Sequence, residues 1–113
     1  MTVSDICRPV SVRDLNDALR RTFVGGEVRL TAGVAALPQA DRDNLLSLVR
    51  SYASFDPGND PYGEHDFGAI EHGGERYFWK IDCYNADLLH ASPDPANAAV
   101  TCRVLTVMLA DEY

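Results

Sequence analysis

The chain has 113 residues, of which 46% are hydrophobic, and its formal net charge is −7 at pH 7. This length and apolar content predict a single domain over residues 1–113, because a second domain would be too small to fold alone. The sequence has no run of about 18 apolar residues and no basic, apolar leader at its start, so we expect a cytoplasmic protein without a signal peptide or membrane span.

The first predicted element is a helix near residues 12–23. Ser11 is a good N-cap, and Asp14 follows three residues later, as in a capping box. Four apolar residues at helical spacing form one stripe: Val12, Leu15, Leu19 and Phe23. We expect the polar residues of the other side to face water: Arg13, Asn16, Asp17, Arg20 and Arg21. The pair Gly25-Gly26 predicts the end of the element.

A short strand and a second helix are expected next. Apolar and polar residues alternate near residues 27–31, which predicts a strand. Pro38 suits the first turn of a helix near residues 38–54. Its apolar stripe is formed by Leu45, Leu46, Leu48, Val49 and Tyr52, and its water-facing side by Asp43, Ser47, Arg50 and Ser54.

The central prediction is a β-hairpin with strands at about 65–72 and 75–83. The pair Gly73-Gly74 supplies the two positive φ angles of a type I′ turn. This turn places Gly68 opposite Trp79. One face is then apolar and belongs to the core: Ile70, Tyr77, Trp79 and Ile81. The other face is half polar, and we expect the chain's own helix or a partner to cover part of it: Phe67, Ala69, Phe78, Lys80 and Asp82.

The last segment, residues 98–112, fits either a helix or a strand. Its β-branched residues favour a strand, whereas the helical period gathers Arg103, Thr106 and Ala110 on one narrow polar arc. We predict a mostly buried helix. The expected fold class is therefore α+β, with a small antiparallel sheet that is built on the hairpin and the strand near 27–31 and is packed by three helices.

The chain has three cysteines, which are widely spaced: Cys7, Cys83 and Cys102. An odd number without a CxxC spacing argues against a disulfide scaffold, a redox pair or a zinc site. We expect reduced and mostly buried thiols.

The charge is distributed unevenly along the chain. Residues 1–50 carry seven arginines against six acidic residues, whereas residues 51–113 carry three basic residues against eleven acidic ones, a net charge of −8. Direct nucleic-acid binding is therefore not expected, because phosphate contacts need clustered Lys or Arg. An acidic surface suits the basic surface of a protein or nucleoprotein complex. The predicted contact residues are Asp56, Asp60, Glu64, Glu71, Glu75, Asp87 and Asp94.

Two alternatives stay open for the contact: the arginine-bearing first helix, and self-association through the second face of the hairpin. A different class of function is a small metal- or thiol-dependent enzyme centred on Glu64, His65, Asp66 and Cys83. Adjacent residues of a strand point to opposite sides, however, and no HExxH-like ligand spacing is present. We predict no catalytic residue, no metal and no cofactor.

The motifs YGEHDFG (residues 62–68) and FWKID (residues 78–82) resemble those of a family of small bacterial proteins with a domain of unknown function, often carried by mobile elements. The resemblance covers residues 26–113, and Cys83 departs from it where an aromatic residue is expected. It implies no catalytic residues. Small acidic proteins of mobile elements include anti-CRISPR and anti-restriction proteins, several of which mimic DNA. We therefore hypothesise a non-enzymatic inhibitor of a host DNA-directed defence complex, such as a CRISPR effector.

Overall fold

Helix α2 (Val12–Thr22) is the first element of the computed structural model, which describes residues 11–113. The predicted capping box is present. The Ser11 hydroxyl accepts a hydrogen bond from the backbone N–H of Asp14 at 3.1 Å, and the Asp14 carboxylate accepts one from the backbone N–H of Ser11 at 3.2 Å. The helix ends before the glycines that were predicted to end it, because Phe23 adopts a left-handed φ of 59° and caps the last turn.

Two helices follow strand β1 (Glu27–Leu30), which forms where a strand was predicted. The short helix α3 (Ala32–Ala35) lies in a link for which no element was predicted. Helix α4 (Gln39–Arg50) ends earlier than predicted, because the chain leaves the helix so that Tyr52 packs edge-on against Trp79, with ring centroids 5.4 Å apart.

The apolar stripe of α4 is confirmed at its centre and wrong at one edge. Leu45 and Val49 are fully buried, whereas 41% of Leu48 is exposed to solvent. The side of α4 that was predicted to face water is exposed, at Asp43, Ser47 and Arg50 among others. The helix therefore buries a narrower stripe than the sequence pattern predicts.

Strands β2 (Phe67–His72) and β3 (Glu75–Tyr84) form the predicted hairpin, with the predicted register. Gly68 lies opposite Trp79, and a Cβ at Gly68 would lie only 2.3 Å from the indole nitrogen. The glycine is therefore required for the indole to lie over the neighbouring strand. The predicted core face of the hairpin is buried, at Ile70, Tyr77, Trp79 and Ile81.

The segment predicted as a helix over residues 98–112 is a strand. It consists of the 3-10 turn η1 (Ala98–Val100), strand β4 (Cys102–Leu109) and the 3-10 turn η2 (Ala110–Glu112). The sheet order is β1-β4-β3-β2, so β4 is a central strand, and residues on both of its faces are buried, Leu105 and Val107 on one and Val104 and Met108 on the other. A strand with two buried faces has apolar residues at successive positions, which removes the alternation that distinguishes a strand from a helix.

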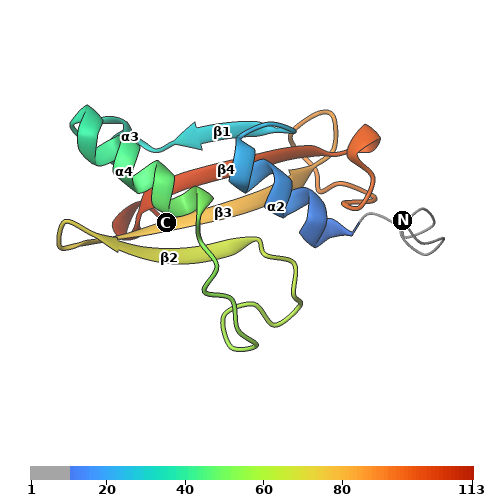
Figure 1. Cartoon of the computed structure of the whole chain (residues 1–113). Coiled ribbons are helices and arrows are strands. Elements are labelled where there is room, and N and C mark those ends of the chain that lie inside the picture. Colours follow the sequence, from blue (N-terminus) through green and yellow to red (C-terminus); the bar gives the residue numbers. More distant parts are fainter. Residues whose placement is uncertain (1–10) are drawn as a thin grey trace.

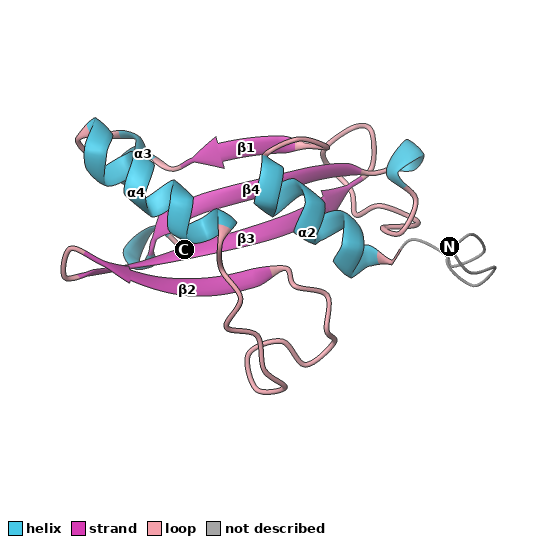
Figure 2. Cartoon of the chain, in the orientation of Figure 1, coloured by secondary structure: helices cyan, strands magenta, loops and turns pink. Residues whose placement is uncertain are grey.

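The sheet is mixed rather than antiparallel. β1 pairs in parallel with β4, whereas β4 with β3 and β3 with β2 are antiparallel. Helices α2 and α4 lie on one face of this sheet (Figures 1 and 2). Between them and the sheet lies the core, which includes Leu19, Val34, Leu45, Trp79 and Leu105. Within residues 11–113, no helix has the length and apolar character needed to cross a membrane.

Among residues 11–113, no α-helix lies across the other face of the sheet, where the 3-10 turn η2 contacts β3 and β4. Tyr113 covers part of it, packing edge-on against Phe67 and Phe78 with ring centroids 6.1 and 5.6 Å apart. The cover expected over the second face of the hairpin is therefore supplied in part by the chain's own last residue, without a helix.

Glu112 ties this C-terminal segment to the link between β1 and α3. Its carboxylate accepts hydrogen bonds from the Thr31 hydroxyl at 2.6 Å, the backbone N–H of Gly33 at 2.9 Å and the backbone N–H of Leu109 at 3.0 Å. These hydrogen bonds, that of Thr31 above all, lower the pKa of Glu112 from its ordinary value of 4.5.

We expect Glu112→Gln to lower the melting temperature at neutral pH, because glutamine accepts hydrogen bonds without a charge. A lowered pKa means that the carboxylate stabilises the fold fully above the ordinary value of 4.5, and that this contribution is lost as the pH falls through the lower folded-state pKa. The melting temperatures of the two proteins should therefore converge in acid. The pKa of Asp87 is also lowered, but Asp87 is present in both proteins, so its effect on stability cancels in the comparison. A constant difference at every pH would contradict this.

Candidate functional site

Three polar side chains between α2, the sheet and the following loops are buried. The exposed fractions are 1% for Asn16, 0% for Arg20 and 3% for Arg103. The prediction that Asn16 and Arg20 face water is wrong, because Asn16 lies between β4 and the loop of residues 51–66, and Arg20 lies between the sheet and the end of α4. The amide of Asn16 donates to the backbone carbonyl of Glu64 in that loop at 3.0 Å and accepts from Nε of Arg103 at 3.0 Å.

The guanidinium of Arg20 joins three elements. It donates to the backbone carbonyls of Val49 and Arg50 at the end of α4, each at 3.1 Å, and to the Asp17 carboxylate at 3.1 Å. Its central carbon lies 5.3 Å from the centre of the Trp79 ring. The planar group thus satisfies carbonyls that the helix leaves without partners and places a positive charge at the C-terminal end of α4.

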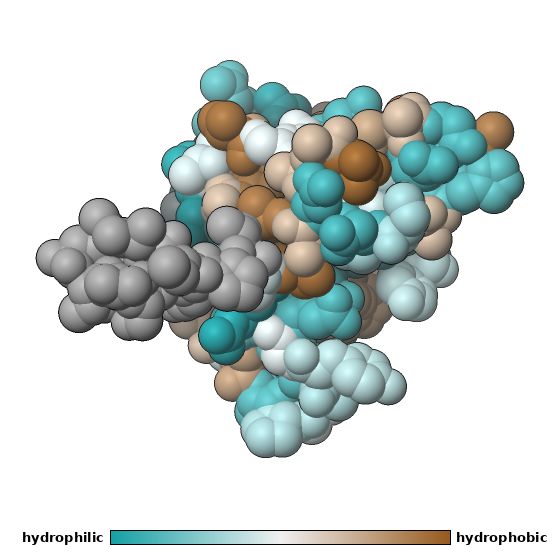
Figure 3. Space-filling view, turned by 90° about the vertical axis from the view of Figure 1, so that its right-hand side faces the viewer, coloured by the Kyte–Doolittle hydropathy of each residue, from teal (hydrophilic) through white to brown (hydrophobic). Residues whose placement is uncertain are grey.

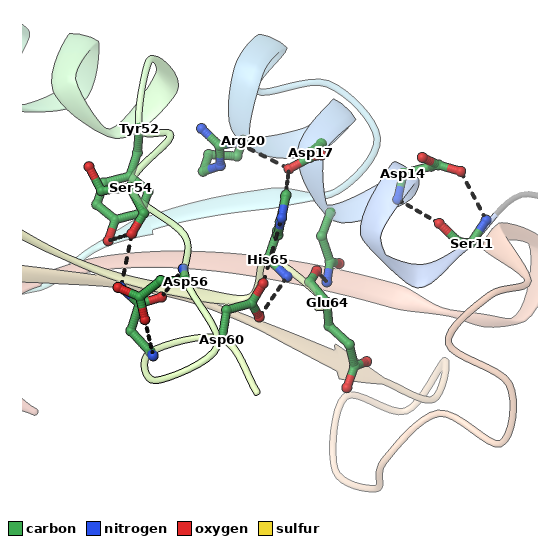
Figure 4. Close-up of polar contacts among 12 residues, drawn as sticks. Ser11, Asp14, Asp17, Arg20, Tyr52, Ser54, Asp56, Asp60, Glu64 and His65 are labelled. Carbon is green, nitrogen blue, oxygen red and sulfur yellow. Dashed lines mark hydrogen bonds and ion pairs between the residues drawn. The ribbon is translucent and has the colours of Figure 1, made fainter. Parts of the chain in front are cut away.

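The same Asp17 carboxylate holds His65 of the 51–66 loop. Nδ1 of His65 lies 2.9 Å from Asp17, and Nε2 lies 3.6 Å from the carboxylate of Asp60 (Figure 4). The imidazole stacks on Phe55 with ring centroids 3.7 Å apart and an interplanar angle of 3°. We call Asp17, Phe55, Asp60 and His65 the His65 cluster. It attaches the loop to α2.

This geometry favours an anchoring role for His65 over a catalytic one. Both ring nitrogens face carboxylates, so neither is directed toward a substrate or a metal ion. The carboxylate of Glu64 points away from the imidazole (Figure 4). In the part of the chain that the structure describes, no group of three or more His, Cys, Asp or Glu side chains could hold a metal ion.

The thiol of Cys83 packs against the core, as its place on the hairpin predicts. Burial raises the pKa of this thiol above its ordinary value of 9.0, and the nearby charge of Arg103 offsets only part of that effect. A raised pKa keeps the thiol protonated, which disfavours nucleophilic chemistry. Cys83 and Cys102 are free and half-buried, less buried than predicted, and Cys7 lies outside the described residues.

The structure places the seven predicted contact carboxylates in three regions. Five are exposed: Asp56 in the 51–66 loop, Glu71 and Glu75 at the hairpin tip, and Asp87 and Asp94 in the 85–97 loop. Glu64 is half-buried, and the side chain of Asp60 is only 7% exposed because it faces His65. The hairpin tip and the 85–97 loop lie at opposite ends of the sheet (Figure 1), so the seven do not form one continuous face.

Asp66 lies just before β2. The residue is exposed, but partial burial of its carboxylate raises its pKa, and the nearby carboxylates of Asp60 and Asp82 raise it further. Neither Asp66 nor Asp82 was among the predicted contacts. The hairpin register indicates that these two residues are close. The backbone N–H of Ile81 donates to the backbone carbonyl of Asp66, and Asp82 follows Ile81 directly.

Three of the exposed carboxylates shape their own loops. Asp56 accepts from the backbone N–H groups of Gly58 and Asn59 at 2.8 and 2.9 Å, and Asp94 accepts from that of Ala96 at 3.3 Å. Asp87 accepts from two backbone N–H groups and pairs with His90 at 2.7 Å. These are Asx-type turns, in which a side-chain oxygen replaces a backbone partner. The lower part of Figure 3, where the 51–66 loop hangs below the sheet, is hydrophilic.

Comparison with known protein families identifies the family of this chain. The family described as "Protein of unknown function (DUF3768)" matches residues 30–112, which is most of the chain. No curated protein and no solved structure matches it.

Proposed function

We propose that this chain, which belongs to the DUF3768 family of proteins of unknown function, is a non-enzymatic acidic binding protein that inhibits a DNA-directed defence complex of its host. The supporting observation is a separation of charges. The guanidinium groups of Arg20 and Arg103 are buried, whereas the carboxylates of the neighbouring loops are exposed, at Asp56, Asp66, Asp87 and Asp94.

Arg13 of α2 lines a pocket with Asp56 and Asp60 of the 51–66 loop, but few cations of the C-terminal half compensate these loops. Of the three basic residues in residues 51–113, Arg103 is inside and Lys80 pairs with Asp82 at 3.0 Å. Arg76 lies at the hairpin end, with Glu71 as its neighbour at 3.9 Å. The field around the 51–66 and 85–97 loops therefore attracts a basic surface and repels nucleic acid.

The choice of a defence complex rests on the kind of surface that such a complex presents. Effectors that bind DNA through its backbone have a positively charged channel, and a protein that offers exposed carboxylates can occupy it in place of phosphates. The resemblance of the YGEHDFG and FWKID motifs to those of small proteins of mobile elements supports this choice.

The alternative of a metal- or thiol-dependent enzyme has less support. It requires a reactive group among Glu64, His65, Asp66 and Cys83. The raised pKa of Cys83 and the two carboxylates that face His65 both disfavour such a group.

The experiment is a phage-plating assay in strains that carry a CRISPR or restriction system directed at the phage. The wild-type protein should restore plaque formation in at least one system. The charge-neutralised variant carries Asp→Asn at positions 56, 66, 87 and 94 together with Glu64→Gln. It should not restore plaque formation in any of these systems. Asparagine keeps the side-chain oxygen that each Asx turn needs, so the melting temperature should change little. Asp60 stays unchanged because it holds His65.

The matched control replaces two exposed arginines of α2, Arg13→Gln and Arg21→Gln, and leaves the buried Arg20 in place. This variant should keep its activity if the acidic surface makes the contact. Loss of activity in the arginine variant with full activity in the acidic one would place the contact on α2 instead. Wild-type protein that protects phage in none of the systems would contradict the defence role.

A further inference from the structure

The sheet face opposite α2 and α4 carries charged side chains in two adjacent rows. The register aligns residues of β1, β4 and β3 across the strands. The cationic row consists of Arg29, Thr106 and Lys80. The anionic row consists of Glu27, Val104 and Asp82. The neighbours of these residues along each strand, such as Val28, Leu105 and Ile81, point to the core, so both rows lie on the face opposite α2 and α4.

Apolar pairs flank the two rows. Phe78 lies opposite Met108, one step beyond the cationic row, and Tyr84 lies opposite Cys102, one step beyond the anionic row. Along the strands, the face therefore reads apolar, cationic, anionic, apolar.

We propose that a second copy of this chain packs on this face, about a two-fold axis that runs across the strands between the cationic and anionic rows. Such a rotation reverses the strand direction and turns the face over. The cationic row of each copy then lies over the anionic row of the other. Met108 is only 2% exposed and Tyr113 packs over Phe78, so Tyr113 of one copy then faces the Tyr84 and Cys102 pair of the other, and every row meets a complementary one.

The charges of this face favour a second copy over a small ion. The face has a groove of about 610 Å³, whose lining includes Arg29 and Lys80 against Asp82 and Glu112, so its cations and carboxylates balance. The pairs within one copy, Arg29 with Glu27 at 2.6 Å and Lys80 with Asp82 at 3.0 Å, are partly exposed and can be shared across an interface. Packed sheets lie about 10 Å apart, a distance that long basic side chains can span.

The size of the face predicts a reversible dimer. The four strands have 4, 6, 10 and 8 residues, which at a spacing of about 4.8 Å and a rise of about 3.3 Å outline roughly 440 Å² per copy, and Tyr113 already covers part of this area. The total stays below about 1,000 Å², in the range of weak, transient interfaces. We therefore expect the dimer to dissociate on dilution and to weaken in high salt.

The test is a concentration series of the wild type by sedimentation velocity, followed by two charge reversals. Lys80→Glu alone places like charges opposite each other in the dimer, and so does Asp82→Lys alone. Each should raise the dissociation constant at least about tenfold. A mixture of the two variants should dimerise again, because residue 80 of one copy then meets an opposite charge at residue 82 of the other in both contacts.

The mixing result separates this proposal from a structural role of the Lys80–Asp82 pair, because neither variant regains its own internal pair. Asp43→Lys, on the exposed side of α4, is the control and should leave the dimer unchanged. If a reversal at residue 80 or 82 prevents folding, Arg29→Glu and Glu27→Arg provide the same test on β1. A wild type that stays monomeric at every concentration, or variants that stay monomeric when mixed, would overturn the proposal.

Discussion

Replacing Trp79 with alanine should lower the free energy of unfolding by about 3–5 kcal/mol, the range for truncating a large buried aromatic side chain. The indole is fully buried and is the largest such side chain of the core. Tyr52 and Phe55 pack edge-on against it, with centroids 5.4 and 6.1 Å away, and the Arg20 guanidinium lies over its ring. Its removal leaves a cavity that joins α2, α4 and the hairpin, which surrounding side chains cannot fill without repacking.

Urea denaturation measures this loss, and Trp79→Phe is the matched control. Among the described residues, the indole N–H has no hydrogen-bond acceptor, so phenylalanine loses volume but no hydrogen bond. The loss for phenylalanine should therefore be clearly smaller than for alanine. A loss below about 1 kcal/mol for Trp79→Ala would contradict the burial of this side chain.

Replacing Arg20 with alanine should cost about 3 kcal/mol, because it removes one partner of a buried, hydrogen-bonded charge. The substitution leaves the carbonyls of Val49 and Arg50 without their donor and takes the cation away from Asp17, whose side chain is only 14% exposed. Since Asp17 also holds His65, the 51–66 loop should loosen. Hydrogen exchange in that loop should become faster than in the wild type.

Two variants distinguish this role from a general effect of charge. Arg21→Ala, one residue along the helix and 63% exposed at its side chain, should change the stability by less than about 0.5 kcal/mol. Arg20→Lys keeps the charge but lacks the planar fork that bonds two carbonyls and a carboxylate together, so it should recover only part of the loss. Full stability in Arg20→Lys would show that the charge alone is sufficient.

Local chemistry predicted the parts of the fold that depend on neighbouring residues. The pair Gly73-Gly74 sets the hairpin turn, and the turn sets every pairing from Phe67 with Lys80 to His72 with Glu75. The capping box of Ser11 and Asp14 sets the start of α2. The α+β class, the strand at 27–30 and the core face of the hairpin follow from periodicity in the same way, because each depends on residues a few positions apart.

Predictions that required knowledge of distant neighbours failed. β4 pairs with β1 and β3 at its edges and is buried on both faces by other segments, such as α2 and η2, and its own sequence does not contain that information. Leu48 fits the apolar stripe of α4, but no element within residues 11–113 covers it, and 41% of it is exposed. The parallel pairing of β1 with β4 likewise depends on segments more than 70 residues apart.

The sequence by itself determined the excess of carboxylates in the C-terminal half. It thus determined that the surface of this half carries a negative net charge. Only the tertiary structure decided which charges reach that surface. Asn16 and Arg20 lie at i,i+4 spacing beside Leu19, a weak signal of burial that a polar side chain normally overrules. They are buried because distant segments supply the partners that a buried polar group requires: the backbone carbonyl of Glu64 and the Arg103 guanidinium for Asn16, and the last carbonyls of α4 for Arg20. The 51–66 loop also folds back over α2, where His65 holds the Asp17 carboxylate that Arg20 binds.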